Sequence, residues 1–186
     1  MDRRKNVADF YKNIAKNDGI STDGEKEIAV ALSLGYSLED IEDGNLGLGC
    51  GNPTENANLK PDDILVDLGS GKGIDVFKAA KILTNGKAIG IDNLPEMVEK
   101  AREIATKRGF NNTEFILSEI DDINLPDESC TVVISNCVIN LLEDKKKVYS
   151  EIFRILKPGG RLSISDIIQI NPLPQEIKED PHMIAT

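Results

Sequence analysis

Two cysteines are the residues of this 186-residue chain whose settings are most suggestive of chemistry. Cys50 lies in NLGLGCGNP (45–53), where glycines and a proline favour a loop over a helix or strand. Cys137 lies in ISNCVINL (134–141), directly after a predicted strand. Thiolates are ligands for soft elements, so both positions are candidate binding sites. The alternatives are an incidental thiol in a glycine turn at 50 and a small buried side chain at 137.

A glycine-rich loop, DLGSGKG (67–73), is the strongest cofactor signal. Gly69, Gly71 and Gly73 follow a predicted strand and precede a predicted helix, where backbone N–H groups can face a ligand. A dinucleotide fingerprint needs glycine at the position of Ile74 and a nest for pyrophosphate. The acidic Asp67 instead suits the sulfonium and amino groups of S-adenosylmethionine. A nicotinamide-binding fold and a cofactor-free domain are the alternatives.

Helical and strand patterns alternate after residue 60 and predict the scaffold that positions these residues. The alternation favours a doubly wound, mostly parallel α/β sheet, which binds ligands beyond the carboxyl ends of its strands. Strands are predicted in DILVDLGSG (63–71) and at 87–92, 113–118, 130–136 and 161–168. Helices are predicted at 3–16, 24–33, 37–42, 74–83, 95–108 and 144–156, the last ended by KPGG.

Composition excludes several classes of function. The net charge of −10 repels phosphate backbones, so we expect no nucleic-acid partner. No apolar run reaches the roughly 20 residues that cross a bilayer, and we expect no membrane partner. An odd count of three cysteines is no disulfide framework and predicts free thiols in a reducing cytoplasm. The single histidine, His182, makes a histidine base improbable, and we expect it on the surface.

The segment VDLGSGKG resembles the glycine-rich motif of class I S-adenosylmethionine-dependent methyltransferases, and LKPGGRLSISD resembles a later motif of that family. The resemblance covers about residues 60–168. It implies that Asp92 accepts the ribose hydroxyls and that Glu119 and Ile120 flank the adenine. We add the neighbouring polar residues as candidates. The cofactor-binding candidates are then Asp67, Gly69, Ser70, Gly71, Gly73, Asp92, Asn93, Glu119, Ile120 and Asn136.

GCGNP together with SNCVINL resembles the arsenite methyltransferases, and the similarity extends over about residues 34–182. This resemblance implies an enzyme that transfers methyl groups to trivalent arsenic held by Cys50 and Cys137, with a thiol as co-reductant. Arsenic would then be a substrate ligated by the two cysteines. Its lone pair accepts the methyl group without loss of a proton, which agrees with the lack of an acid–base pair near Cys137.

Two other functions are compatible with these patterns. One is a methyltransferase acting on a carbon, nitrogen or oxygen acceptor, such as a quinone or lipid precursor. The other is a non-catalytic module that binds S-adenosylmethionine or arsenic without turnover. The arsenite family also uses a third cysteine, which would fall at or just past Thr186. Cys130 opens the fourth predicted strand at the opposite end from the site, so we expect it in the core.

The predicted organisation has four parts. Residues 1–44 form a helical segment whose first helix, with Phe10 and Tyr11, acts as a lid. Residues 45–59 form the glycine and cysteine loop, and 60–170 form the methyltransferase core. Residues 171–186 are a truncated tail, with the final antiparallel strands expected to be missing. Asp166 either faces the site or, as we expect, caps a loop.

Overall fold

The computed structural model describes residues 3–16, 24–41, 49–172 and 174. Its strands are β1 (Ile64–Leu68), β2 (Lys87–Asp92), β3 (Thr113–Leu117), β4 (Cys130–Asn136) and β5 (Leu156–Ser165). Its α-helices are α1 (Arg3–Lys16), α2 (Gly24–Ser33), α3 (Leu38–Ile41), α4 (Pro53–Asn56), α5 (Ile74–Ile82), α6 (Pro95–Arg108) and α7 (Lys145–Ile155). A 3-10 turn, η1 (Ile139–Leu141), follows β4. The predicted division into four parts stays a prediction.

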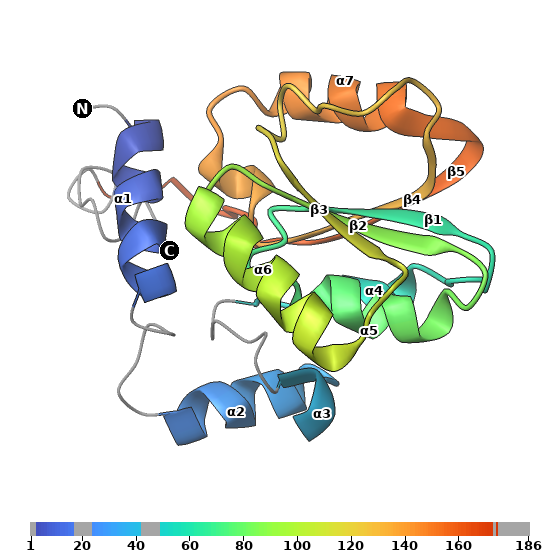
Figure 1. Cartoon of the computed structure of the whole chain (residues 1–186). Helices are drawn as coiled ribbons and strands as arrows, with labels where there is room; N and C mark the ends of the chain where they lie inside the picture. The colour runs from blue at the N-terminus through green and yellow to red at the C-terminus, as the bar shows by residue number, and fades with distance from the viewer. Residues whose placement is uncertain (1–2, 17–23, 42–48, 173, 175–186) are drawn as a thin grey trace.

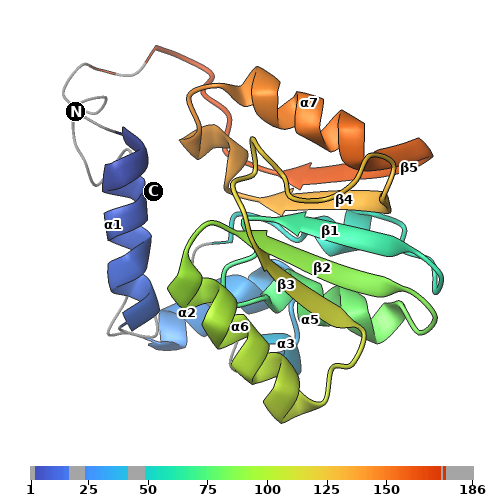
Figure 2. The same cartoon turned by 45° about the horizontal axis from the view of Figure 1, so that its top comes forward.

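The five strands form one parallel sheet in the order β3-β2-β1-β4-β5. Helices α5 and α6 cover one face, and α7 covers the other (Figure 1). The predicted doubly wound α/β fold is therefore confirmed. The direction of winding reverses between β1 and β4, which makes their carboxyl ends the switch point where such sheets bind ligands. Figure 2 shows α1 standing beyond these carboxyl ends.

The central strands are buried on both faces, as the apolar run ILVDL predicted for β1. Two apolar clusters pack on the sheet, one between the sheet and helices α5 and α6, the other between the sheet and α7. A third, smaller cluster gathers Ala31, Tyr36 and Ile41. Phe77 of α5 stacks on Phe110 with ring centroids 4.9 Å apart and meets Phe115 of β3 edge-on at 5.6 Å. This packing fixes α5, and with it the loop that precedes α5, against the sheet.

Local signals set the helix ends where the sequence predicted them. Pro95 opens α6 at its first turn, and Gly109 closes it in the left-handed conformation, φ 74°. The side chain of Asp144 accepts a hydrogen bond from the backbone N–H of Lys147 and caps α7. Because these caps depend only on nearby residues, the helix boundaries can be predicted from the sequence alone.

Two elements differ from the sequence prediction. Strand β5 begins at Leu156, before KPGG, because residues 157–160 bulge out of the ladder: Cys130 pairs with Leu156, whereas Val132 pairs with Arg161. Proline lacks an N–H for pairing, and Gly159 adopts φ 78°, so the bulge forms at this point. The strand ends at Ser165 and not at 168. Helix α4 was not predicted, and His182 lies outside the described residues.

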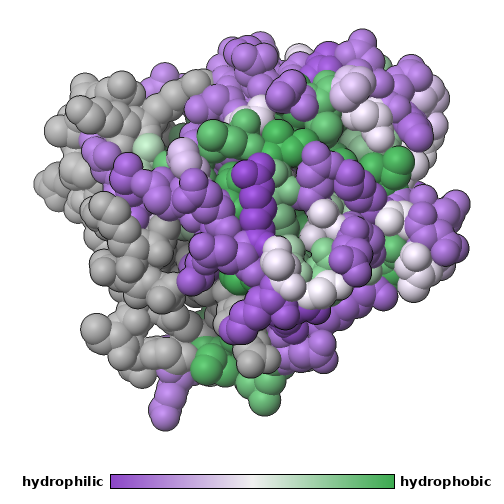
Figure 3. All heavy atoms as spheres, viewed as in Figure 1, coloured by the Kyte–Doolittle hydropathy of each residue, from purple (hydrophilic) through white to green (hydrophobic). Residues whose placement is uncertain are grey.

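The visible surface is mainly hydrophilic, as the net charge of −10 leads one to expect, with a band of hydrophobic residues between α6 and α7 (Figure 3). Within the described ranges, no helix is long and apolar enough to cross a bilayer.

Candidate active site

A cavity of about 180 Å³ opens at the carboxyl ends of β1, β2 and β4. It brings together every predicted site residue except Cys50 and Gly73. Gly73 instead caps α5 at φ 96°, where a Cβ atom would meet Phe115 at 2.8 Å. Gly73 therefore shapes the loop from behind without lining the cavity. The predicted cofactor candidates that line it are Asp67, Gly69, Ser70, Gly71, Asp92, Asn93, Glu119, Ile120 and Asn136.

The glycine loop does not present its N–H groups to a ligand as the sequence suggested. The N–H groups of Gly69 and Ser70 both donate to the carbonyl of Ile91, and that of Gly71 donates to Asp92 Oδ2 at 2.9 Å. The loop folds onto the end of β2, which consumes these donors. A pyrophosphate would find no nest of free N–H groups there, so the geometry argues against a dinucleotide.

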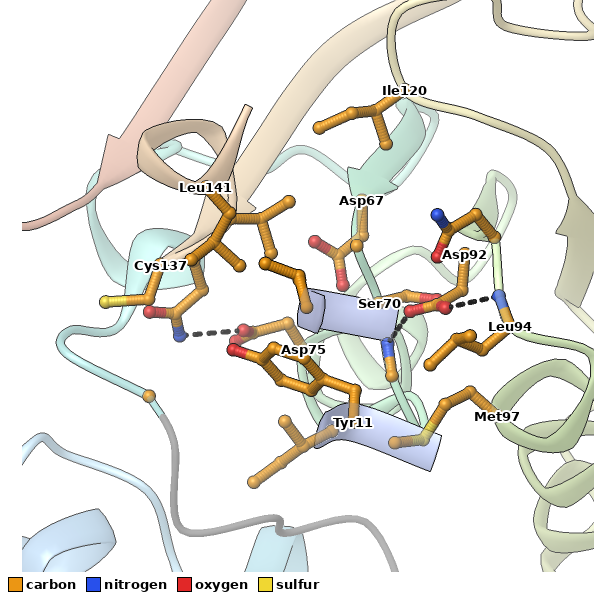
Figure 4. Close-up of a pocket in the computed structure, with 18 of the residues that line it drawn as sticks. Tyr11, Asp67, Ser70, Asp75, Asp92, Leu94, Met97, Ile120, Cys137 and Leu141 are labelled. Atoms are coloured by element: carbon orange, nitrogen blue, oxygen red, sulfur yellow. Dashed lines mark hydrogen bonds between the residues drawn. The ribbon is translucent and has the colours of Figure 1, made fainter. Parts of the chain in front are cut away.

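Asp92 ends β2 with its carboxylate held from both sides (Figure 4). Oδ2 accepts from Gly71 N, and Oδ1 accepts from Leu94 N at 3.0 Å. A carboxylate offers about four lone-pair sites, so it retains capacity for a hydroxyl donor beside these backbone donors, and this geometry fits the predicted ribose contact. Asn93 Nδ2 lies 3.2 Å from Glu119 Oε2, and Ile120 is buried beside them.

Three buried carboxyl groups make the cavity strongly acidic. Burial raises the pKa of Asp67 well above its usual range, and the nearby Asp75 and Asp92 raise it further. Burial also raises the pKa of Asp92, against the lowering effect of its backbone hydrogen bonds. Burial likewise raises the pKa of Asp75, opposed by hydrogen bonds from Tyr36 and Asn136. A cationic ligand would relieve this repulsion.

The cavity fits S-adenosylmethionine by its donors as well as by its charge. Ser70 Oγ is buried and has no hydrogen-bond partner among the described residues. A buried hydroxyl without a partner is costly, so it points to a ligand that completes it. Leu94, Met97 and Leu141 add apolar walls that the sequence analysis missed (Figure 4).

Cys50 and Cys137 form a disulfide, with Cα atoms 6.0 Å apart. The expectation of two free thiols is therefore wrong for this structure, because the fold brings the two sulfurs within bonding range. Cys137 lines the cavity, but Figure 4 shows its sulfur turned away from Asp67 and Asp92. Cys137 also has φ 55°, an unusual value for a residue other than glycine, and strain of this kind clusters at functional sites.

The loop that carries Cys50 packs directly on the ends of β4 and β5. A Cβ atom on Gly51 would lie 2.5 Å from the Cβ atom of Ser165, so only glycine fits there. The backbone N–H of Cys50 donates to Asn136 Oδ1 at 3.3 Å, and Asn136 Nδ2 donates to the carbonyl of Gly51 at 2.9 Å. The predicted cofactor residue Asn136 thus holds the cysteine loop.

The other reactive or charged candidates fall where the sequence placed them. Cys130 is fully buried, and burial raises its pKa to about 12. Asp166 accepts from Asn140 N at 3.1 Å and from Ile167 N at 2.8 Å, so it caps loops. From α1, Tyr11 reaches the cavity, and burial with nearby Asp92 and Asp166 raises its pKa to about 12.

A family model described as a methyltransferase domain matches residues 59–186. The chain belongs to this methyltransferase family. Membership makes S-adenosylmethionine its cofactor, as the sequence predicted and as the cavity fits.

The chain is also similar to named relatives of this class. It is 44% identical to an arsenite methyltransferase of Halobacterium salinarum over 90% of this chain and 44% of that protein. It is 32% identical to the arsenite methyltransferase of Mus musculus over 94% of this chain and 50% of that protein. The predicted resemblance to arsenite methyltransferases is thus confirmed.

A solved structure agrees with these similarities. The crystal structure of an arsenic(III) S-adenosylmethionine methyltransferase from Chlamydomonas reinhardtii superposes with a TM-score of 0.67 at 34% identity. The match covers 84% of this chain and 54% of that one. The chain therefore spans about half the length of the relatives it matches.

Proposed function

We propose that this chain methylates trivalent arsenic, using S-adenosylmethionine as donor, Cys50 and Cys137 as arsenic ligands and a thiol as co-reductant. The observation that carries the proposal is the meeting of two cysteines, 87 residues apart in sequence, at the rim of the cofactor cavity. Three similarities to arsenite or arsenic(III) methyltransferases support the choice of substrate.

The disulfide must be opened before the pair can hold arsenic. Two small-molecule thiols reduce it, each losing a hydrogen, and become a disulfide while Cys50 and Cys137 become thiols. Arsenite then exchanges two hydroxyl groups for the two sulfurs, and the thiol protons leave as water. In the disulfide, the Cys137 sulfur is turned away from Asp67 and Asp92 (Figure 4). Opening the bond would free this side chain to rotate its sulfur toward the cavity.

The cavity residues would hold and orient the donor. When bound, S-adenosylmethionine supplies an electrophilic methyl group on a positively charged sulfur. Asp67 favours that cationic ligand, Asp92 accepts from the ribose, and Ser70 donates or accepts one further hydrogen bond. The arsenic lone pair needs no base, since no proton is removed, and the rate then depends on positioning.

The test incubates the chain with arsenite, a thiol and S-adenosylmethionine, and detects methylarsenicals by mass spectrometry. Wild-type protein is expected to yield product, and Cys50→Ser and Cys137→Ser to lose it, while each variant still binds the donor by calorimetry. Absence of product from donor-bound wild-type protein would contradict the proposal. Activity of Cys137→Ser on a quinone or lipid precursor would point to the alternative acceptor. Tight arsenite binding without transfer would indicate a non-catalytic module.

A further inference from the structure

A buried polar network joins the cysteine loop to the cofactor cavity. It consists of Tyr36, which follows α2, Asp75 in the first turn of α5, and Asn136 at the end of β4. Tyr36 and Asp75 are buried, and Asn136 is half-buried. We call these three residues the loop clamp. All three line the cavity, and the sequence analysis assigned a role only to Asn136.

Each member of the loop clamp is held by the other two. Tyr36 Oη donates to Asp75 Oδ1 at 2.8 Å, and Asn136 Nδ2 donates to Asp75 Oδ2 at 3.1 Å. Asn136 Nδ2 also lies 3.2 Å from Tyr36 Oη. The carboxyl group of Asp75 therefore faces a donor on each oxygen, and neither donor can turn away without leaving a buried oxygen unsatisfied.

The loop clamp grips the backbone on both sides of the Cys50 sulfur. Asn136 Oδ1 accepts from Cys50 N, and Asn136 Nδ2 donates to the Gly51 carbonyl, which lies 3.1 Å from Tyr36 Oη. The peptide units before Cys50 and after Gly51 are thus fixed to β4, the strand that continues into Cys137. The position of one cysteine relative to the other is set by these contacts.

We propose that Tyr36, Asp75 and Asn136 are positioning residues. They set the effective concentration of the Cys50 sulfur relative to the Cys137 sulfur, and they hold the Cys50 sulfur in place beside the donor cavity. The methyl-transfer part of this inference rests on the proposed function. The thiol part does not, because it concerns only the two sulfurs of this chain.

The matched test compares Tyr36→Phe with Tyr149→Phe. Tyr36→Phe removes one hydroxyl and keeps the ring against which Lys78 lies, 4.8 Å from its centroid. Tyr149, on α7, is 46% exposed and serves as the control. Each protein is equilibrated with reduced and oxidised glutathione, and the fraction of Cys50–Cys137 disulfide gives the effective concentration of the pair. Thermal melting establishes that each variant is folded.

Tyr36→Phe is expected to lower the effective concentration about tenfold and kcat for arsenite by about tenfold or more, since small misplacements are costly to positioned reactions. The dissociation constant for S-adenosylmethionine is measured alongside, so that a change in donor binding is separated from a change in the methyl-transfer step. A second variant, Asn136→Asp, keeps the shape but turns a donor toward Gly51 into an acceptor, and is expected to act in the same direction.

An unchanged glutathione equilibrium in both folded variants would overturn the positioning role, because a residue that only stabilises the fold leaves it unaltered. Lowered effective concentration without methylation by the wild-type protein would leave the loop clamp standing and refute the proposed function. Methylation by the wild-type protein with both variants unaffected would support the proposed function and refute the positioning role of the loop clamp.

Discussion

At the scale of single residues, the site owes its charge to carboxyl groups placed in an apolar setting. Asp67 lies at the end of β1, only 3% exposed, where burial and two other carboxyl groups raise its pKa. The folded protein therefore binds a proton there more tightly than the unfolded chain does. Between the unfolded and the folded pKa, stability falls as pH rises. A cationic donor reverses this trend, because it binds the ionised form best.

Asp67→Asn tests the electrostatic role of that carboxyl group. The variant is expected to gain stability relative to wild type as pH rises above about 4, the usual pKa of aspartate. It is also expected to bind S-adenosylmethionine about tenfold more weakly or worse at neutral pH, and with less dependence on pH. Calorimetry in two buffers of different ionisation enthalpy counts the protons released on binding. Equal proton release by the two proteins would contradict this interpretation.

Cys137 offers a second residue-scale prediction, because its backbone has φ 55°. In an ordinary strand or helix, glycine is less stable than alanine by roughly 0.5–1 kcal/mol. The left-handed conformation reverses this order, since it costs residues other than glycine about 1–2 kcal/mol. Cys137→Gly is therefore expected to be more stable than Cys137→Ala. Urea unfolding measures the difference in stability between the two variants, both of which lack the disulfide. If Cys137→Ala were the more stable, residue 137 would not have the left-handed conformation.

At the scale of elements, the cysteine loop depends on its fit against β5. Gly51→Ala would place a methyl group 2.5 Å from the Cβ atom of Ser165, so the loop must move off the strand. The variant is expected to lose at least about tenfold in arsenite affinity, as a displaced ligand pair would. Adding Ser165→Gly removes the obstructing side chain and is expected to restore binding. Failure of this rescue would show that the contact does not set the loop position.

The elements were predicted well where their signals are local. Pro95 and Gly109 mark α6, and the apolar run of β1 marks a buried strand. The bulge in β5 was missed because KPGG also fits a simple turn after a helix, and only pairing with β4 shows that the strand begins before it. The loop clamp was not predictable either. Tyr36, Asp75 and Asn136 meet only through the folded sheet, and nothing in their spacing relates them.

The convergence of the two cysteines came from family resemblance and not from spacing. Because the two residues are 87 positions apart in sequence, no local pattern predicts that their Cα atoms lie 6.0 Å apart. The cavity residues were more accessible to prediction, because the carboxyl ends of parallel strands share one edge of the sheet. The apolar walls from Leu94, just before α6, and Met97, within α6, were not predicted, since apolar side chains at such positions usually signal core packing.

At the scale of the whole molecule, the disulfide closes a large loop that runs from α4 through β4 and contains β1, α5, β2, α6 and β3. Chain-entropy arguments assign a loop of this length about 4–5 kcal/mol of stabilisation. Reduction is therefore expected to lower the free energy of unfolding by up to that amount. Urea unfolding with and without a reducing agent measures the effect. Cys50→Ser is the control, and it is expected to be insensitive to the reductant. Identical curves for wild-type protein would mean that the bond does not form in solution.

The burial of Cys130 has a practical consequence for anyone who labels this molecule. Its sulfur is sealed beneath α7, 3.3 Å from the carbonyl of Ile155, and holds its proton tightly. A maleimide, a mercurial or a fluorescent biarsenical dye added to the native, reduced protein is therefore expected to react only at the pair Cys50 and Cys137. A dye bound to this pair would report on other compounds that compete for the two sulfurs. Its release can be followed without first replacing Cys130.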